Sequence, residues 1–258
     1  MPLYSVALAA HAAAAAGRAS TAQGMDAQLF CDPRRALRSR GAQPRCTIGA
    51  SRMTNSKAFG RLAAEIGACA VCAPHLPLGP RPIIRGRPSA RLLIISQAPG
   101  RRVHDTGLSF NDRSGDRLRA WLALDRETFY DESRVAIMGM AFCFPGSNRK
   151  GGDLPPRREC APLWHARLRG CFSAVELTLL VGSYAFDYYL PDFGTRSLTE
   201  VIAHWRDFLP ELFVLPHPSW RTTRWLRDNP WFENQTLPEL RTRVARVLSA
   251  SRAVKPVP

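Results

Sequence analysis

Four cysteines have a spacing that suits metal binding. Cys69 and Cys72 form a C-x2-C pair, and such a loop presents two thiolates to one metal centre. Cys143 and Cys160 come later, at the predicted end of a strand and the predicted start of the next helix. The cysteine pattern favours metal binding over disulfides, with zinc as one candidate metal and simple buried thiols as the alternative.

A second group of reactive side chains follows the apolar run Leu92–Ile95, which is typical of a strand buried on both faces. Pro99 lacks an N–H and Gly100 can take positive φ, so a tight turn ends this strand. The loop after it is longer than ordinary βα loops and carries polar groups around an aromatic ring: His104, Asp105, Phe110, Asn111 and Asp112. Ligands of open α/β sheets bind at this end of the strands, so we predict a site here, with an ordinary surface loop as the alternative.

A histidine stands in the same position after a later strand. His217 follows the apolar run Leu212–Leu215 and precedes Pro218, which restricts the backbone beside it. A histidine in such a loop can donate or accept a proton near neutral pH. We therefore predict that His217 is functional; the alternative is a histidine of the core.

Hydrophobic periodicity predicts the elements that position these groups. Buried strands are predicted at 92–95, 135–140, 177–181 and 212–215, and helices at 59–66, 160–168, 184–190 and 198–208, with others beginning near 114, 222 and 237. Strands that alternate with helices indicate a three-layer α/β/α domain with a mainly parallel four-stranded central sheet. Ser114 is the expected N-cap of the helix after the central loop. Residues 74–88 and 147–159 are expected to be connectors.

Composition sets the domain organisation. We expect a poorly ordered extension over residues 1–55, one domain over 56–250 and a disordered tail over 251–258. The extension is rich in Ala and Arg, and a targeting segment or a misassigned start codon would also explain it. A hydrophobic content of 45% suffices for a core, and no apolar run approaches the roughly 20 residues of a membrane span.

Charge and cysteine content indicate the partner and the compartment. The formal charge of +15 favours a polyanionic partner. Seven cysteines, unevenly spaced, favour a reducing compartment over a disulfide framework. Three of them fall outside the metal pattern: we expect Cys171 in the core, and Cys31 and Cys46 are treated as incidental.

Two stretches together resemble a known family. SQAPG followed by TGLSFNDRSGDRL is similar to the first signature of the uracil-DNA glycosylase superfamily, and LPHPSWR, from Leu215 to Arg221, is similar to the second. With the cysteines, the resemblance is closest to the iron–sulfur branches, the family 4 and family 5 type enzymes. It covers roughly Phe59 to Leu248.

The resemblance implies an activity and a cofactor. The activity would be hydrolysis of the N-glycosidic bond of uracil or another deaminated base in DNA, as in base excision repair. The four patterned cysteines would ligate a structural [4Fe–4S] cluster, with zinc as the alternative. We expect a monomer that acts on DNA in a bacterial-type cytoplasm, associated with the nucleoid and not with a membrane. The enzyme would be monofunctional, because Lys57, Lys150 and Lys255 lie outside the motifs.

The resemblance also assigns roles to residues. His217 would donate to the departing base, and Asp112 would position water or stabilise the cationic sugar, with His104 and Asp105 in reserve. Phe110, unless it only fills the core, would stack on the base. Other contacts to the substrate would come from Gln97, Ala98, Pro99, Gly100 and Ser219. Contacts to the rest of the DNA would come from Trp220, Arg221, Arg101 and Arg113, with further phosphate contacts from Arg102, Arg149, Arg157 and Arg158.

Two positions depart from the family pattern. Ala98 stands where the superfamily can place an Asp, and Gly139 stands where related enzymes often carry an Asn that reads the pyrimidine edge. These departures support one alternative, a nucleic-acid-binding protein of the same fold with weak or no catalysis. A zinc-bearing α/β hydrolase of small nucleosides is a further alternative, which the basic charge disfavours.

Overall fold

The computed structural model describes residues 52–193 and 196–249. Helix α1 spans Arg52–Gly67, so its first turn precedes the expected domain boundary at residue 56. The expected extension up to residue 51, which holds Cys31 and Cys46, lies outside the described residues. The expected tail at 251–258 also lies outside them.

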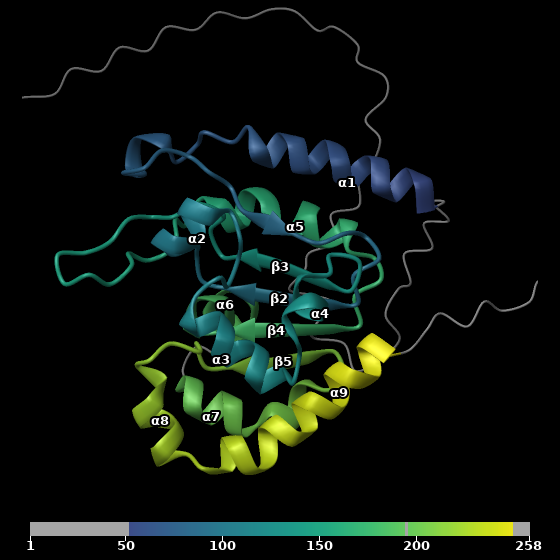
Figure 1. The fold of residues 1–258 in the computed structure, drawn as a ribbon, viewed down its shortest axis with the longest axis vertical. Helices are drawn as coiled ribbons and strands as arrows, with labels where there is room; N and C mark the ends of the chain where they lie inside the picture. The colour runs from purple at the N-terminus through teal and green to yellow at the C-terminus, as the bar shows by residue number, and fades with distance from the viewer. Residues whose placement is uncertain (1–51, 194–195, 250–258) are drawn as a thin grey trace, which may run out of the picture. The chain divides into compact units, whose positions relative to one another are not determined.

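A mostly parallel sheet of five strands forms the centre of the fold (Figure 1). Its strands are β1 (Ile84–Arg85), β2 (Leu92–Ser96), β3 (Val135–Gly139), β4 (Leu177–Val181) and β5 (Leu212–Leu215). They lie in the order β1-β3-β2-β4-β5, and only β1 is antiparallel to its neighbour. The four predicted strands are confirmed. The fifth, β1, was not predicted because two residues after a proline-rich stretch give no periodic pattern.

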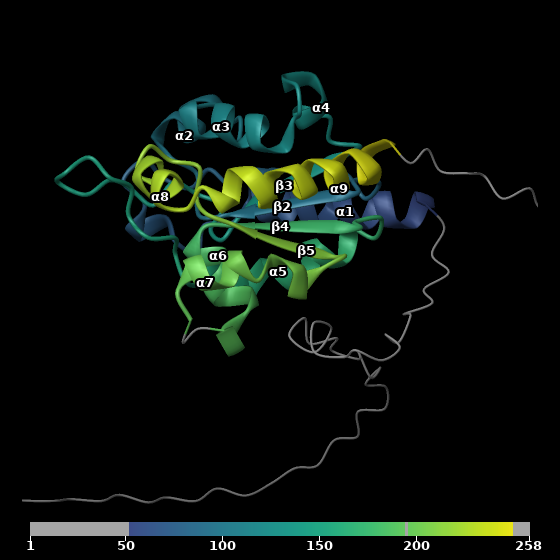
Figure 2. The same ribbon diagram turned by 90° about the horizontal axis from the view of Figure 1, so that it is seen from below.

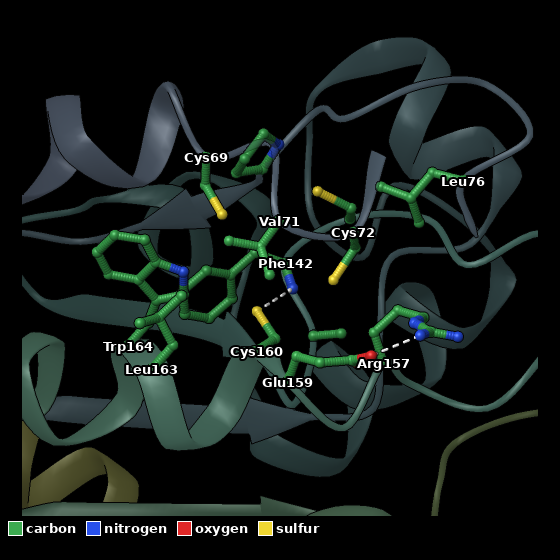
Figure 3. A pocket seen from close by; sticks show the side chains of 13 residues that line it. Cys69, Val71, Cys72, Leu76, Phe142, Arg157, Glu159, Cys160, Leu163 and Trp164 are labelled. Carbon is green, nitrogen blue, oxygen red and sulfur yellow. Dashed lines mark hydrogen bonds and ion pairs between the residues drawn. The ribbon is translucent and has the colours of Figure 1, made fainter. Parts of the chain in front are cut away.

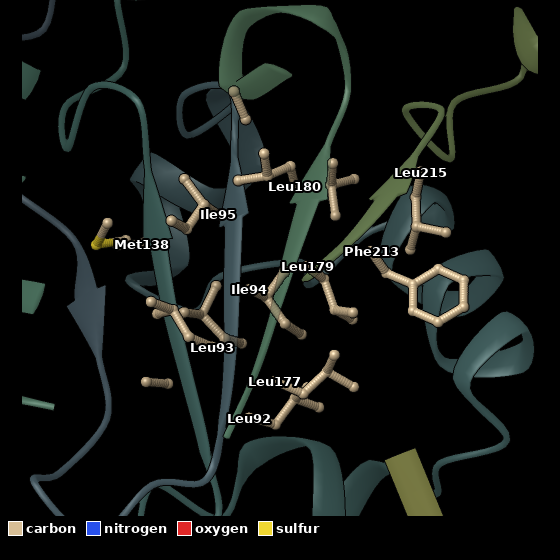
Figure 4. Packing of buried hydrophobic residues seen from close by; sticks show 14 of the residues in the cluster. Leu92, Leu93, Ile94, Ile95, Met138, Leu177, Leu179, Leu180, Phe213 and Leu215 are labelled. Carbon is tan, nitrogen blue, oxygen red and sulfur yellow. The ribbon is translucent and has the colours of Figure 1, made fainter. Parts of the chain in front are cut away.

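The sheet is buried because helices cover both of its faces. Leu92, Leu93, Ile94 and Ile95 of β2 are almost fully buried, and side chains of β3, β4 and β5 pack beside them (Figure 4). Strands with two covered faces are continuous apolar runs rather than alternating ones, which explains the pattern in the sequence. The position of β2 between β3 and β4 places the end of this strand at the middle of one sheet edge.

Helices form the layers on either side of the sheet. Figure 2 shows α2, α3 and α4 on one side and α5, α6 and α7 on the other. The long C-terminal helix α9 packs against α3 and β2. The helical elements after α1 are η1 (Ala73–His75), α2 (Arg101–Thr106), α3 (Arg113–Leu122), α4 (Arg126–Tyr130), α5 (Cys160–Cys171), α6 (Ser183–Tyr189), η2 (Pro191–Phe193), α7 (Leu198–Ala203), η3 (Trp205–Phe208), α8 (Thr222–Asp228), η4 (Phe232–Thr236) and α9 (Leu237–Ser249). None of the helices in the described ranges is long and apolar enough to cross a membrane.

Three local expectations need correction. The N-cap of α3 is Asp112 and not Ser114, because the Asp112 carboxylate accepts the Gly115 N–H at 2.8 Å. The loop after β2 contains a short helix, α2, which ends at Gly107 in the left-handed conformation. The helix predicted over 198–208 is two pieces, and the ring of His204 between them bonds back to the Glu200 carbonyl at 2.8 Å.

The start of α3 requires glycine, and this gives a first prediction. A Cβ at Gly115 would lie 1.7 Å from the carbonyl oxygen of Phe110, so Gly115→Ala must displace backbone. We expect it to cost at least about 1–3 kcal/mol of unfolding free energy. Gly170→Ala is the matched control, because nothing lies within 4 Å of a Cβ in that helix, and it should be neutral or stabilising by about 0.4–1 kcal/mol. Urea denaturation compares the two, and equal stabilities would contradict the contact.

Candidate active site

The carboxyl ends of the parallel strands open into a cavity of about 450 Å³. The loops after β2, β3 and β5 and the start of α6 line it. The predicted site residues that line it are Gln97, Ala98, Pro99, Gly100, Phe110, Asp112, His217, Ser219, Trp220 and Arg221. Residues from distant parts of the chain therefore meet in one cavity, as the sequence predicted.

His217 is held by its own loop. The Ser219 N–H donates to the His217 carbonyl oxygen at 2.8 Å, and the Thr222 hydroxyl donates to the same oxygen. The ring Nε2 lies 3.0 Å from the side-chain nitrogen of Gln97. Burial lowers the pKa of His217 to about 4, although the carboxylate of Asp112 opposes this shift. The imidazole is therefore neutral at neutral pH and keeps one N–H and one acceptor nitrogen.

Asp112 serves the helix and the cavity at once. Its Oδ1 accepts the Gly115 N–H at the start of α3, and the residue also lines the cavity beside His217. The sequence predicted Asp112 as a site residue and Ser114 as the cap, whereas Asp112 both caps the helix and lines the cavity. The cap fixes the carboxylate, and it leaves Oδ2 without a partner in the described part of the chain.

Phe110 has a strained backbone that its neighbours maintain. Its φ is 55°, a left-handed value that costs a residue with a Cβ about 1–3 kcal/mol. Its carbonyl oxygen accepts from the Tyr130 hydroxyl at 3.0 Å and from Arg119 at 3.3 Å. The ring packs edge-on against Phe129 and also lines the cavity. Phe110 is thus both a core residue and a wall of the site.

Arg117 of α3 anchors the loop that follows His217, and no motif in the sequence marks it. Its guanidinium donates to the Ser219 carbonyl at 2.6 Å and to the Thr223 hydroxyl at 3.1 Å. Trp220 lies between these two anchors with 77% of its surface exposed. The Arg221 guanidinium lies 5.5 Å from the centre of its ring. The loop is therefore fixed at its base, and its tip presents an aromatic ring to solvent.

The departure at Gly139 has a steric cause. A Cβ there would lie 2.5 Å from the Ala141 carbonyl oxygen and 2.9 Å from that of Gln97, so no side chain fits without a backbone shift. Beneath it, His165 donates from Nε2 to the Gly139 carbonyl at 3.1 Å and accepts the Tyr189 hydroxyl at 2.7 Å. Burial lowers the pKa of His165 to about 4, which keeps this bridge neutral. Gln97 is the residue that brings a side-chain amide to the lining of the cavity.

Some predicted residues lie away from the cavity. His104 is buried against Phe144, with ring centres 6.0 Å apart, and does not line the site. Asp105 pairs with Arg101 at 3.0 Å. Arg157 lies beside Cys72 and donates to Glu159 at 2.5 Å, so it belongs to the cysteine region. The other predicted DNA contacts, Arg102, Arg113, Arg149 and Arg158, are exposed and outside the cavity.

Tyr184 and Asp153 line the cavity, although the sequence did not predict them as site residues. Tyr184 begins α6 and lines the wall. Asp153 comes from the hairpin after β3, within the stretch expected to be a plain connector. Partial burial raises the pKa of its carboxyl; the Ser147 hydroxyl opposes this, while the negative charge of Asp112 adds to it. The only signal in the sequence was an acidic residue within an otherwise Gly-, Pro- and Arg-rich loop.

The four predicted cysteines line a second, mostly apolar cavity (Figure 3). Cys69 and Cys72 follow α1, Cys143 follows β3, and Cys160 begins α5. The Phe142 N–H donates to the sulfur of Cys160 at 3.4 Å. Burial raises the pKa of the Cys160 thiol to about 12 and also raises those of Cys72 and Cys143. Thiolates here would need a nearby cation, which a metal centre provides.

The four cysteines line one cavity, but their side chains are not arranged as a metal site. No group of three or more His, Cys, Asp or Glu side chains within residues 52–193 and 196–249 is arranged to hold a metal ion. Cys171 lies apart from the four and is buried in the core, as expected.

Acid should destabilise the folded protein through His217. Its pKa is about 4 in the folded state against an ordinary value of 6.5, so unfolding takes up a proton between these values. The stability that the neutral ring contributes is complete above about pH 6.5 and is lost as the pH falls toward 4. The melting temperature should fall over this range in calorimetry, and it should fall less steeply in His217→Asn. Equal slopes would contradict the low pKa.

Comparison with known families agrees with this geometry. A profile of the Uracil DNA glycosylase superfamily matches residues 83–241, which is more than half of the chain. The matched range contains the sheet, the loop after β2 and the loop that holds His217. Family enzymes of this type act on DNA, so the cavity at the carboxyl edge of the sheet corresponds to the place where such a fold binds its ligand. The chain therefore belongs to the uracil DNA glycosylase superfamily.

Proposed function

We propose that the protein is a monofunctional DNA glycosylase that hydrolyses the N-glycosidic bond of uracil or another deaminated base. The observation that carries the proposal is a neutral His217 and a carboxylate, Asp112, in one cavity of a superfamily fold. None of the residues that line the cavity is a lysine, which supports hydrolysis by water rather than through a Schiff base.

The cavity suits a base that has left the DNA stack. Its volume of about 450 Å³ exceeds what a single pyrimidine needs, and Phe110 offers an aromatic wall. Gln97 brings an amide to within 3.0 Å of His217, so an incoming base can exchange hydrogen bonds with this pair. Because Gly139 leaves no room for an amide, we propose that Gln97 reads the base edge. A purine such as hypoxanthine is then a possible substrate besides uracil.

His217 and Asp112 have complementary roles in this proposal. As the bond to the sugar breaks, negative charge grows on the base and positive charge on the sugar. A neutral imidazole keeps one N–H group, and this group can donate a hydrogen bond to a carbonyl oxygen of the base. Asp112 supplies the negative charge that offsets the cationic sugar, through the oxygen that the helix cap does not use.

The surface around the cavity supports a DNA partner. Trp220 is the most exposed of the large apolar side chains in the described ranges, and it stands at the cavity beside Arg221. We propose that Trp220 enters the space left by the flipped base and that Arg221 contacts phosphate. Arg101 and Arg113 begin the helices α2 and α3 at the same edge, where a phosphate would also meet helix N-termini.

We also propose that the four cysteines hold a [4Fe–4S] cluster with a structural role. Four thiols from three separate segments converge on one mostly apolar cavity, and the Phe142 N–H points at one of the sulfurs. A bound cluster would supply a covalent link between the end of α1, the end of β3 and the start of α5. Zinc remains the alternative occupant, and the test below separates the two.

A protein that binds DNA without excising bases is the second candidate. Ala98 and Gly139 favour it, because neither supplies the polar side chain that relatives carry there. The positions of Asp112 and His217 in the cavity oppose it, since a binding module has no need of a desolvated histidine beside a carboxylate.

Excision by the wild type and by His217→Ala tests the activity. Duplexes containing uracil, hypoxanthine, xanthine or hydroxymethyluracil would be incubated with excess protein, and abasic sites would be cleaved with alkali. At least one base should be released, and His217→Ala should release it on the order of 100- to 1,000-fold more slowly. His204→Ala is the matched control, because that histidine is exposed and outside the cavity. If the wild type releases none of the bases, the activity is wrong; if His217→Ala matches it, the assigned donor is wrong.

Spectroscopy and metal analysis test the cluster. Protein purified without oxygen should absorb broadly near ~400 nm and contain iron and inorganic sulfide. Cys69→Ser and Cys160→Ser should lose this absorption together with stability, whereas Cys171→Ser should keep the absorption. Colourless wild-type protein with stoichiometric zinc would replace the cluster by a zinc site.

A further inference from the structure

We propose that Asp153 is a second catalytic carboxylate, which accepts the proton of the water that attacks the sugar. This role rests on the proposed glycosylase activity and adds to it a residue that neither motif contains. Asp153 lines the same cavity as His217 and Asp112, and it comes from a separate segment, the hairpin between β3 and α5.

The hairpin has a defined backbone that fixes Asp153 at its base. The Leu154 N–H donates to the Gly146 carbonyl at 2.8 Å, and Ser147 and Asp153 form an antiparallel bridge. At the tip, Asn148 bonds to Gly152 through its backbone N–H at 2.7 Å and through its side-chain oxygen at 3.1 Å. Figure 1 shows this segment as a green loop that projects beyond the edge where the strands end. The base of the hairpin places the Asp153 carboxylate near Gly100, which follows β2 at that edge.

The carboxylate lies against the loop after β2, close to Gly100. A Cβ at Gly100 would lie 3.0 Å from Oδ2 of Asp153. The other oxygen accepts the Ser147 hydroxyl at 3.4 Å, which is a long bond. Gly100 is also the N-cap of α2, so Asp153 lies at the turn for which the family resemblance predicted substrate contacts.

Asp153 has no ion-pair partner in the part of the chain that the structure describes, although the chain has a formal charge of +15. Among the described residues, no Lys, Arg or His nitrogen lies within the 4.0 Å of an ion pair with it. The positive charge of Arg221 lowers the pKa of Asp153, and one Arg221 nitrogen lies 3.0 Å from where a Cβ of Gly152 would be. Asp153 therefore lines the cavity without an ion-pair partner among the described residues, which leaves its carboxylate accessible to a substrate or a water molecule.

Asp112 and Asp153 have different surroundings, which suits them to different roles in the reaction. Asp112 has one oxygen bound to the helix cap, which suits a fixed negative charge near the sugar. Asp153 has no such strong donor, and partial burial together with the charge of Asp112 raises its pKa. A carboxylate with a raised pKa is a better proton acceptor at neutral pH. In many enzymes, two carboxylates whose surroundings separate their pKa values have different catalytic roles.

The step balances without any further reactant. The oxygen of a water molecule forms a bond to C1′ of the sugar, and the electron pair of the C1′–N bond leaves with the base. One water proton passes to the Asp153 carboxylate. His217 stabilises the departing base by its hydrogen bond, and the base then takes a proton from solvent, to which Asp153 later returns its own.

The test compares Asp153→Asn with wild type at saturating protein, on whichever duplex the wild type cleaves fastest. The single-turnover rate should fall on the order of 100-fold, as for loss of a general base. Affinity for a duplex with a non-cleavable 2′-fluoroarabino nucleotide at the target should stay within about twofold. Asp207→Asn, an exposed acid on η3, is the matched control and should keep the wild-type rate.

The pH profile distinguishes a proton acceptor from a residue that only shapes the loop. Wild-type activity should fall in acid as Asp153 becomes protonated, with a midpoint above that of an ordinary Asp because the pKa is raised. The part of this acid limb that Asp153 sets should be lost in Asp153→Asn and should persist in Ser147→Ala, which removes the hydroxyl but keeps the acid.

The outcomes separate this role from the function on which it rests. If the wild type releases no base, the proposed activity fails and this role with it. If the wild type is active and Asp153→Asn has the same saturated rate, only the role of Asp153 fails. A variant that binds DNA weakly but reacts at the wild-type rate once bound would also overturn the catalytic role, because it would show that Asp153 acts by supporting Arg221.

Discussion

The parallel pairing of β2 with both β3 and β4 is the constraint on which the site depends. Because parallel strands end at the same edge, this pairing brings the loops after β2, β3 and β5 together, although they are far apart in the sequence. Gln97 and His217 then meet across the cavity at 3.0 Å. The continuous apolar sequence of β2 stabilises this pairing, because all of its side chains are buried only where both faces of the strand are covered.

The first turns of α3 carry much of the precision of the site. Asp112 caps the helix and faces the cavity, and Gly115 leaves room for the carbonyl of Phe110. From the same helix Arg119 bonds to that carbonyl, while Arg117 bonds to the loop beyond His217. One short helix therefore fixes an acid, an aromatic wall and the position of a second loop. Such shared anchoring explains how a strained backbone at Phe110 is maintained.

The segment between β3 and α5 links the two cavities. Cys143 and Cys160 stand near its two ends, and Asp153 lies on the hairpin between them. Arg157 also belongs to this segment. The sequence predicted it as a phosphate contact, but its side chain lies beside Cys72, which follows α1. A metal centre at these cysteines would restrain both ends of the hairpin that carries the acid. In this way a group with no part in the chemistry can still influence the geometry of the reacting residues.

The sequence by itself determined the features that are local or repeat along the chain. The apolar runs predicted β2 to β5, and the resemblance of the two signatures predicted that Asp112 and His217 belong to one site. The resemblance of the cysteine pattern to the same family predicted the four cysteines that line the second cavity. Each of these follows from residue type and short-range order, which are visible in one dimension.

Tertiary structure alone decided the contacts between distant segments. Arg117 bonds to Ser219 from 102 residues away, and Asp153 approaches Gly100 from another loop, so no spacing rule marks either. Gly139 was visible as a departure, but only the carbonyl oxygens around it show why no side chain fits there. The two-residue strand β1 forms only because β3 offers it an edge. Such contacts depend on how strands and loops pack in three dimensions, and the types of the residues concerned do not encode that packing locally.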